Sequence, residues 1–295
     1  MTSSYFSVSN GVRQGGILSP YLFTFYINNL SVQLNQIHVG CYIGSHLLNH
    51  LMYADDIVLI SPSVRGMDKL LKCCEMFADE HDMLFNTLKS VNLNIVNSAL
   101  KDVPLPDFFL NGSPIPSASS VKYLGHIFNT NCLDNEDIQR QRRVLCASAN
   151  SLIRKFYMCS PEVKLKLFTA FCSPLYTSHL WWNFHKSVFR KFQTQYNSAI
   201  KRLLNFSKFE STSLVCSVFC VRSCQEMIRH FVHKFMNRLS TSPNVFISQY
   251  HGSISYMLSP ITRFYYCIIP CTLSMCSYLV IWTLFAFCTL CCTDL

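Results

Sequence analysis

The sequence has few charged residues: they make up 14% of its 295 residues, whereas hydrophobic residues make up half. A chain this long and this apolar can bury a core in one large domain or two small ones. It lacks an opening basic stretch followed by an apolar one, so no secretory signal peptide is predicted. Its 16 cysteines are spaced too irregularly, in too long a chain, for a disulfide scaffold. We therefore expect an intracellular protein, nuclear or cytoplasmic, whose cysteines are reduced and packed as small apolar residues.

Acidic residues are almost absent from the middle of the chain. From Arg140 to Lys208 there are 13 lysines and arginines and one acid, Glu162, whereas residues 1–139 hold 7 basic and 12 acidic residues. A solvated helical surface is one interpretation of such a block. A polyanionic partner such as nucleic acid is the other, and it suits so uneven a distribution better.

Charged residues are missing altogether from residues 264–293. This stretch is long enough to span a bilayer, but Pro270 and many Ser, Thr and Cys residues make its first part a poor helix. Residues 278–292 alone are short for a span. Two interpretations of residues 241–295 stay open, a membrane-associated segment and an aberrant end never selected as protein, and we favour the second.

Two adjacent aspartates interrupt an apolar stretch in the first quarter of the chain. Residues 51–60 read Leu-Met-Tyr-Ala-Asp-Asp-Ile-Val-Leu-Ile, and two ionised carboxylates would be costly inside a packed sheet. The pattern predicts a β-hairpin whose turn carries Asp55 and Asp56 to solvent or to a cation. Mg²⁺ is usually bound through one or two carboxylates plus substrate phosphates. The hairpin is therefore a candidate metal site.

A glycine-rich segment precedes a strong helix start near the beginning of the chain. Residues 11–20 read Gly-Val-Arg-Gln-Gly-Gly-Ile-Leu-Ser-Pro. The paired glycines permit close backbone approaches that a Cβ would forbid. Ser19 followed by Pro20 is typical of an N-cap and the first helical position, and apolar spacing predicts a helix up to about residue 35.

The remaining segments alternate at first between helix and strand and then become helical. Residues 66–81 predict an amphipathic helix, Asn111-Gly112 predicts a tight hairpin turn, and residues 121–128 predict a strand. Beyond residue 130 the apolar spacing predicts four helices, over 134–157, from 161 to about 173, 187–206 and 213–239. Cys216, Cys220 and Cys224 recur every four residues in the last of these, which favours a packed helix face over a zinc site.

Four segments, in order, resemble consecutive motifs of the reverse transcriptase palm. They are Val12–Pro20, Tyr53-Ala54-Asp55-Asp56, Asn86 with Lys89, and Tyr123-Leu124-Gly125. The first segment, and Cys-Ser-Pro-Leu-Tyr at 172–176, resemble retrotransposons of the LINE type, which lack long terminal repeats. The resemblance covers roughly residues 5–240. It implies an α+β chain with a partial palm (an antiparallel sheet with helices) at 1–130, a basic α-helical thumb at 131–240 and a hydrophobic tail at 241–295.

The resemblance also implies an activity and a role for each motif. The activity is RNA-directed DNA polymerisation, with an RNA template, a DNA primer and deoxynucleoside triphosphates. Asp55 and Asp56 would hold Mg²⁺, with Mn²⁺ as an alternative, in a two-metal arrangement. Lys89 would approach the nucleotide phosphates, where it could also donate a proton to the pyrophosphate. Residues that would contact nucleotide and template are Arg13, Gln14, Gly15, Gly16 and Tyr53, and those of the primer grip are Tyr123, Leu124 and Gly125.

One element of the family is absent from this sequence. The palm of such enzymes begins with a strand carrying a further metal-binding aspartate, and no Asp precedes Asp55 here. We therefore expect an N-terminally truncated enzyme that is impaired or inactive alone and exposes apolar surface. Two other hypotheses stay open: a non-catalytic remnant that at most binds nucleic acid, and a protein tethered to a membrane by its tail.

Overall fold

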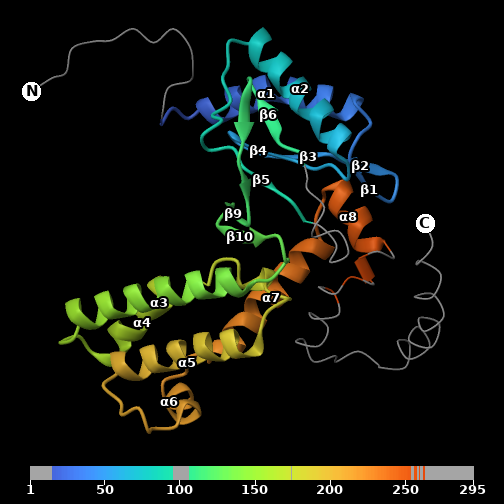
Figure 1. The fold of residues 1–295 in the computed structure, drawn as a ribbon. Coiled ribbons are helices and arrows are strands. Elements are labelled where there is room, and N and C mark those ends of the chain that lie inside the picture. The colour runs from blue at the N-terminus through green and yellow to red at the C-terminus, as the bar shows by residue number, and fades with distance from the viewer. Residues whose placement is uncertain are drawn as a thin grey trace, which may run out of the picture. The chain divides into compact units, whose positions relative to one another are not determined.

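The computed structural model describes residues 15–95, 106–173, 175–253, 256–257, 259 and 262, which combine helices with short strands (Figure 1). The expected α+β class is confirmed. The described residues divide into two compact units. The first contains those up to Val121 together with Asn129–Asn131, and the second contains Lys122–Phe128 together with those from Cys132 onward.

The first unit consists of two helices and several two-stranded ribbons. Its helices are α1 (Ser19–Gln36) and α2 (Val64–Glu80), and its strands are β1 (Cys41–Ile43), β2 (His46–Leu48), β3 (His50–Tyr53), β4 (Asp56–Leu59), β5 (Asn92–Leu93), β6 (Phe108–Leu110), β7 (Ser113–Ile115) and β8 (Ser117–Ala118). Three ribbons, β1–β2, β3–β4 and β6–β7, are antiparallel, and β5–β8 is parallel. In the described residues the strands pair only two by two, so the expected single antiparallel sheet is not formed there.

The two helices supply the core on which these ribbons depend, because an isolated two-stranded hairpin is only marginally stable. Leu30 and Leu34 of α1 are buried against Leu70, Cys74 and Phe77 of α2. The buried positions of α2 recur every three or four residues, as the sequence predicted. Another face of α2 packs on the β6–β7 hairpin, in a cluster of Leu71, Phe108, Leu110 and Ile115. Helix α2 therefore supports two hairpins at once.

The beginning of α1 differs from its end in burial. Its N-cap position falls on Leu18 rather than on Ser19 as predicted, and Pro20 lies in its first turn. Large apolar side chains there are exposed, Ile17 to 89% and Phe25 to 86%, together with Leu18, Tyr21 and Leu22. The sequence predicts exposed apolar surface where a palm strand is missing, and that cause stays a prediction.

The second unit is mainly helical. Its elements are α3 (Asn135–Lys155), α4 (Pro161–Phe171), the 3₁₀ turn η2 (Ser178–Leu180), α5 (Lys186–Leu203), α6 (Thr212–Val218), α7 (Cys224–Ser240) and α8 (Val245–Gly252). Helices α3 and α5 pack along each other, and their core surrounds Trp181 with Phe168, Phe192 and Tyr196. The strands β9 (Ser120–Tyr123) and β10 (His126–Asn129) pair through a two-residue turn, and residues 122–128 belong to this unit.

The single helix predicted over residues 213–239 is wrong, because the chain breaks between α6 and α7. Cys220 has a φ of 53°, which a helix cannot accommodate. Ser223 then starts α7 with a capping box. The Ser223 hydroxyl accepts from the Glu226 amide, and the Glu226 carboxylate accepts from the Ser223 amide. Cys216 and Cys224 are buried and Cys220 is exposed, so the three cysteines do not share one helix face.

Within the part of the chain that the structure describes, no helix is both long enough and apolar enough to cross a bilayer. The uncharged stretch 264–293 lies outside the described residues, and both interpretations of it stay predictions.

Candidate active site

Asp55 and Asp56 lie at the tip of the β3–β4 hairpin, as predicted. Tyr53 pairs directly with Asp56, and Ala54 and Asp55 form the connecting turn. Ala54 has a φ of 52°, in the left-handed region that costs an L-residue other than glycine about 1–2 kcal/mol. The preceding pair, Met52 and Ile57, packs on the α1–α2 core. Since successive residues of a strand face opposite sides, Tyr53 and Asp56 lie on the face away from that core.

The base of the hairpin is fixed to α1 by hydrogen bonds. The side chain of Asn49, only 1% exposed, donates to the Leu34 carbonyl at 2.7 Å. Its oxygen lies 2.6 Å from His50 Nδ1, and His50 Nε2 lies 2.7 Å from Ser31 Oγ. Burial lowers the pKa of His50, which favours the neutral ring. These contacts hold the strands while leaving the tip in solvent.

Both carboxylates of the tip are exposed, and no described residue forms a hydrogen bond or ion pair with either of them. Two adjacent carboxylates that have no partner in the described part of the chain provide hard oxygen donors for a divalent cation. Among the described residues, no three His, Cys, Asp or Glu side chains gather closely enough to hold a metal ion. The pair is therefore an open site that needs further ligands from elsewhere.

Lys89 is exposed on a turn that Asn86 builds. The Lys89 amide donates to both the side-chain oxygen and the carbonyl of Asn86, each at 3.2 Å. The Ser90 hydroxyl donates to the same carbonyl at 2.9 Å. Asn86 thus has a structural role, shaping the turn that presents Lys89 to solvent. No hydrogen bond or ion pair in the described residues joins Lys89 to Asp55 or Asp56.

The glycine-rich segment is described only in part. Arg13 and Gln14 lie outside the described residues. Gly15 has a φ of 78°, and a Cβ built on it would meet nothing within 4 Å. Gly16 lies next to it, and its carbonyl accepts from the Ser19 amide at the start of α1. The positive φ of Gly15, rather than crowding, is what requires glycine there.

Leu124 and Gly125 form the turn between β9 and β10, and Tyr123 is the last residue of β9. Leu124 and Gly125 have φ values of 45° and 83°, and two successive positive values are the signature of a type I′ hairpin turn. A Cβ on Gly125 would lie 2.8 Å from the ring of Tyr176. The Gly125 carbonyl accepts from Arg140 Nη2 at 2.6 Å. The turn is therefore attached to α3 and to the segment that follows α4.

The attachment depends on a buried carboxylate that the sequence did not single out. Asp137 is fully buried; its Oδ1 accepts from Arg140 Nε and Nη2 at 3.0 and 2.7 Å. Its Oδ2 accepts from the Thr177 hydroxyl at 2.7 Å and the Trp181 indole at 2.8 Å. These contacts, together with His126, outweigh the effect of burial and hold the pKa of Asp137 far below its usual range.

His126 lies between two carboxylates, 3.3 Å from Asp137 Oδ2 and 3.5 Å from Asp134 Oδ1. Burial alone would lower its pKa, but Asp134 and Asp137 outweigh that effect and raise the pKa to about 9. The ring is therefore a cation at neutral pH. Asp134 also accepts from the Trp182 and Asn183 amides, so this cluster joins the hairpin, α3 and the segment after η2.

Replacing Gly125 with alanine is expected to lower the free energy of unfolding by about 1–3 kcal/mol. The new Cβ would require a left-handed L-residue and would clash with Tyr176. Urea denaturation of the two proteins measures the difference. Gly44→Ala is the matched control, since that glycine also has a positive φ, 61°, but open space around its Cβ position. Equal losses in both variants would show that the Tyr176 contact contributes nothing.

Nine of the thirteen basic residues of the predicted block are exposed, and Arg140, Arg142, Lys164 and Lys201 are not. Lys164 is buried, and the Lys201 ammonium donates to the carbonyls of Lys208 and Glu210, so neither is free for a ligand. The exposed members are Arg143, Arg154, Lys155, Lys166, Lys186, Arg190, Lys191, Arg202 and Lys208.

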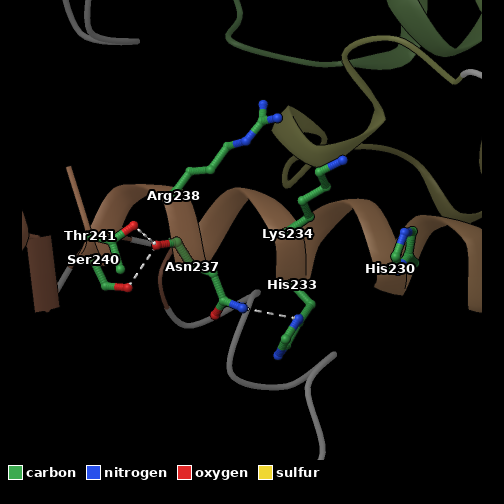
Figure 2. Close-up of a pocket in the computed structure, with 7 residues that line it drawn as sticks. All are labelled: His230, His233, Lys234, Asn237, Arg238, Ser240 and Thr241. Carbon is green, nitrogen blue, oxygen red and sulfur yellow. Dashed lines mark hydrogen bonds between the residues drawn. The ribbon is translucent and has the colours of Figure 1, made fainter.

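A second basic surface, which the sequence did not indicate, lies on α7. It lines an open hollow of about 480 Å³ with His230, His233, Lys234, Asn237, Arg238, Ser240 and Thr241, all exposed. Figure 2 shows Lys234 and Arg238 extending from one side of the helix, and His233 and Asn237 from another. His230, Lys234 and Arg238 follow one another at intervals of four residues, which aligns them along the helix. Such a row suits a phosphate backbone.

Comparison with known proteins finds relatives that are similar to much of this chain. Residues 2–128 match the family model described as reverse transcriptase (RNA-dependent DNA polymerase). The chain is 26% identical over 188 residues, 59% of its length, to a retrovirus-related Pol polyprotein from the type-1 retrotransposable element R2 of Popillia japonica. It is 23% identical over 253 residues, 82% of its length, to the RNA-directed DNA polymerase from the mobile element jockey of Drosophila funebris.

These relatives are much longer than the chain, which spans 30% of the R2 protein and 27% of the jockey protein. A second R2 relative, from Drosophila melanogaster, is 29% identical over 147 residues, 46% of this chain and 14% of its own length. The matched family region contains the Asp hairpin, the Lys89 turn and most of the β9–β10 hairpin. Residues 2–128 therefore match the reverse transcriptase family, and the chain is similar to proteins of the R2 and jockey mobile elements.

Proposed function

We propose that this chain is part of an RNA-directed DNA polymerase that adds deoxynucleotides to a primer on an RNA template. The observation that carries the proposal is the pair of exposed carboxylates of Asp55 and Asp56, which have no partner among the described residues. They lie at the tip of a hairpin packed on α1 and α2. It lies within a region of the reverse transcriptase family. In this proposal the first unit acts as the palm and the basic helices of the second as the thumb.

The donor chemistry of the hairpin fits Mg²⁺, with Mn²⁺ as an alternative. Both ions prefer carboxylate oxygens, and Mg²⁺ usually keeps open positions for substrate phosphates. When bound, the ions would supply the positive charge that activates the primer 3′ hydroxyl and stabilises the departing pyrophosphate. Asp55 and Asp56 hold the ions, and the core beneath Met52 and Ile57 keeps the tip in place.

The other motif residues contribute binding in this proposal. Lys89 provides a mobile cation toward the nucleotide phosphates, on the turn that Asn86 shapes. Tyr53 lies across from Asp56 and contacts the primer end. Arg13, Gln14, Gly15 and Gly16 line the pocket for template base and nucleotide, and Tyr123, Leu124 and Gly125 grip the primer.

A primer-extension assay with the full chain tests the proposal. The chain would be incubated with a 5′-labelled DNA primer on an RNA template, the four deoxynucleoside triphosphates and Mg²⁺ or Mn²⁺. We expect extension that requires the template and stops when the metal is chelated. Its rate should be low, because the described residues supply no third metal-binding side chain. Extension that persists in chelator would contradict the metal mechanism.

A second candidate is nucleic-acid binding without catalysis. It is favoured by the small number of metal ligands, because the described residues offer two carboxylates and no cluster of three. The basic surfaces of the second unit also favour it. Binding of the primer–template with unchanged affinity when Asp55 and Asp56 are replaced, and without extension by the native chain, would identify this function.

Replacing Lys234 and Arg238 with alanine together is expected to weaken binding of an RNA–DNA duplex and to reduce its dependence on salt. The affinity falls with salt, so the slope of log K against log salt concentration is negative. Removing one phosphate-binding cation reduces the magnitude of this slope by about one, so the slope of the double variant should be less steep by about two. Fluorescence anisotropy between 50 and 200 mM salt measures the slope. The control is Lys69→Ala with Lys72→Ala, two exposed lysines of α2, which removes equal charge. Equal slopes for both variants would assign the effect to net charge alone.

A further inference from the structure

The turn at Tyr123–Gly125 is held by a chain of hydrogen bonds that ends in the buried core. Arg140 Nη2 reaches the Gly125 carbonyl at 2.6 Å, while the same guanidinium is fixed by Asp137 Oδ1. Asp137 in turn accepts from Thr177 and Trp181. The orientation of an arginine that donates two hydrogen bonds to one carboxylate is set by its planar guanidinium as well as by its charge. The orientation of Arg140 is therefore set by groups that do not touch the turn.

The turn needs this support because its backbone is unfavourable alone. Leu124 has a φ of 45° and is 42% exposed, so its own side chain does little to stabilise a left-handed conformation. Gly125 lies against the ring of Tyr176, and the Tyr176 carbonyl accepts from the Gln141 side chain. One turn of α3 thus supplies Asp137, Arg140 and Gln141, which fix both the turn and the ring beneath it.

We propose that Asp137 and Arg140 are positioning residues that hold the Tyr123–Gly125 turn in the conformation that receives the primer end. The inference rests on the proposed function and adds to it two residues outside the family motifs. Neither residue touches substrate in this proposal. Arg140 acts through the Gly125 carbonyl, and Asp137 acts through Arg140.

The test combines two measurements on Arg140→Ala, Arg140→Lys and the control Arg143→Ala. Arg143 is exposed on the same helix, and its removal costs the same charge. The first measurement is amide hydrogen exchange of residues 122–129 in the free chain. The second is photo-crosslinking of the full chain to an RNA–DNA duplex with 4-thiothymidine at the primer 3′ end, with the yield in that peptide divided by the amount bound.

We expect exchange in residues 122–129 to be about tenfold faster in Arg140→Ala, as for the loss of a hydrogen bond to a charged group, and unchanged in Arg143→Ala. The crosslink yield should fall about fivefold or more in Arg140→Ala, because the turn spends less time in one conformation. For Arg140→Lys, the exchange rate and the crosslink yield should lie between those of Arg140→Ala and the native chain. An ammonium keeps the charge but cannot bind both Asp137 and the Gly125 carbonyl as the planar guanidinium does.

Each alternative result is informative. Unchanged exchange in Arg140→Ala would overturn the inference without any reference to nucleic acid. Faster exchange with an unchanged crosslink would overturn the positioning role. If the native chain itself gives no crosslink to residues 122–129, this turn does not contact the primer end. Faster exchange in Arg140→Ala would then show only that Arg140 stabilises the turn. Denaturation curves separate local loosening from general unfolding.

Discussion

Replacing Asp137 with alanine is expected to lower the free energy of unfolding by about 3–5 kcal/mol, the cost of removing one partner from a buried ion pair. The carboxylate is fully buried. Without it, the Thr177 hydroxyl and the Trp181 indole lose their acceptor, and the cations of Arg140 and His126 lose their nearest counter-charge. Urea denaturation followed by tryptophan fluorescence measures the change, since Trp181 lies in this core.

Glu136→Ala is the matched control for that experiment. Glu136 precedes Asp137 in the first turn of α3 and is exposed, so its loss removes only a favourable interaction with the helix dipole, about 0.3–1 kcal/mol. Similar losses in the two variants would show that the buried hydrogen bonds of Asp137 contribute little.

The same cluster predicts a dependence of stability on pH. The pKa of His126 is raised from 6.5 to about 9 in the folded chain, so the folded state holds its proton more tightly than the unfolded state. Its contribution is complete below pH 6.5 and is lost as the pH rises through about 9. In Asp137→Ala only Asp134 continues to raise that pKa, so the loss of stability between about pH 7 and 9 should be smaller than in the native chain.

The elements that could be predicted from the sequence are those whose signal is local. The buried face of α2 follows from apolar residues at helical spacing. The turn at Asn111-Gly112 has φ values of 50° and 70°, as an Asn-Gly hairpin requires. The Asp55–Asp56 tip was predictable for the same reason, because two carboxylates between apolar strands can only be placed at a turn.

What the sequence did not predict depends on contacts between distant residues. Asp137 looks like an ordinary acidic residue in the first turn of a helix, and its partners Thr177 and Trp181 are 40 and 44 residues away. Lys201 belongs to the basic block that the sequence shows, but its ammonium is bound by carbonyls in the loop after its helix. The break before α7 did carry a local signal, Ser223 followed by Glu226, but continuous apolar spacing obscured it.

Replacing Asp55 or Asp56 with asparagine is expected to reduce primer extension by on the order of a hundredfold or more. An amide keeps the size of the side chain but removes the charge that binds the cation. Because both side chains are exposed, and lack a partner in the described residues, the free energy of unfolding should change by less than about 0.5 kcal/mol. The loss would therefore be specific to the site.

Binding of Mn²⁺, followed by electron paramagnetic resonance, gives a measurement that does not require extension. Its affinity for the chain with duplex and nucleotide present should fall about tenfold or more in either variant, since fewer charged ligands weaken such a site. Asp79→Asn is the control, because Asp79 is an exposed residue of α2 and its replacement changes the net charge equally. If both hairpin variants bound Mn²⁺ and extended the primer as the control does, the Asp55–Asp56 tip would not be the metal site. If they lost Mn²⁺ while the native chain bound it without extension, the hairpin would be a metal site that needs ligands beyond the described residues to act.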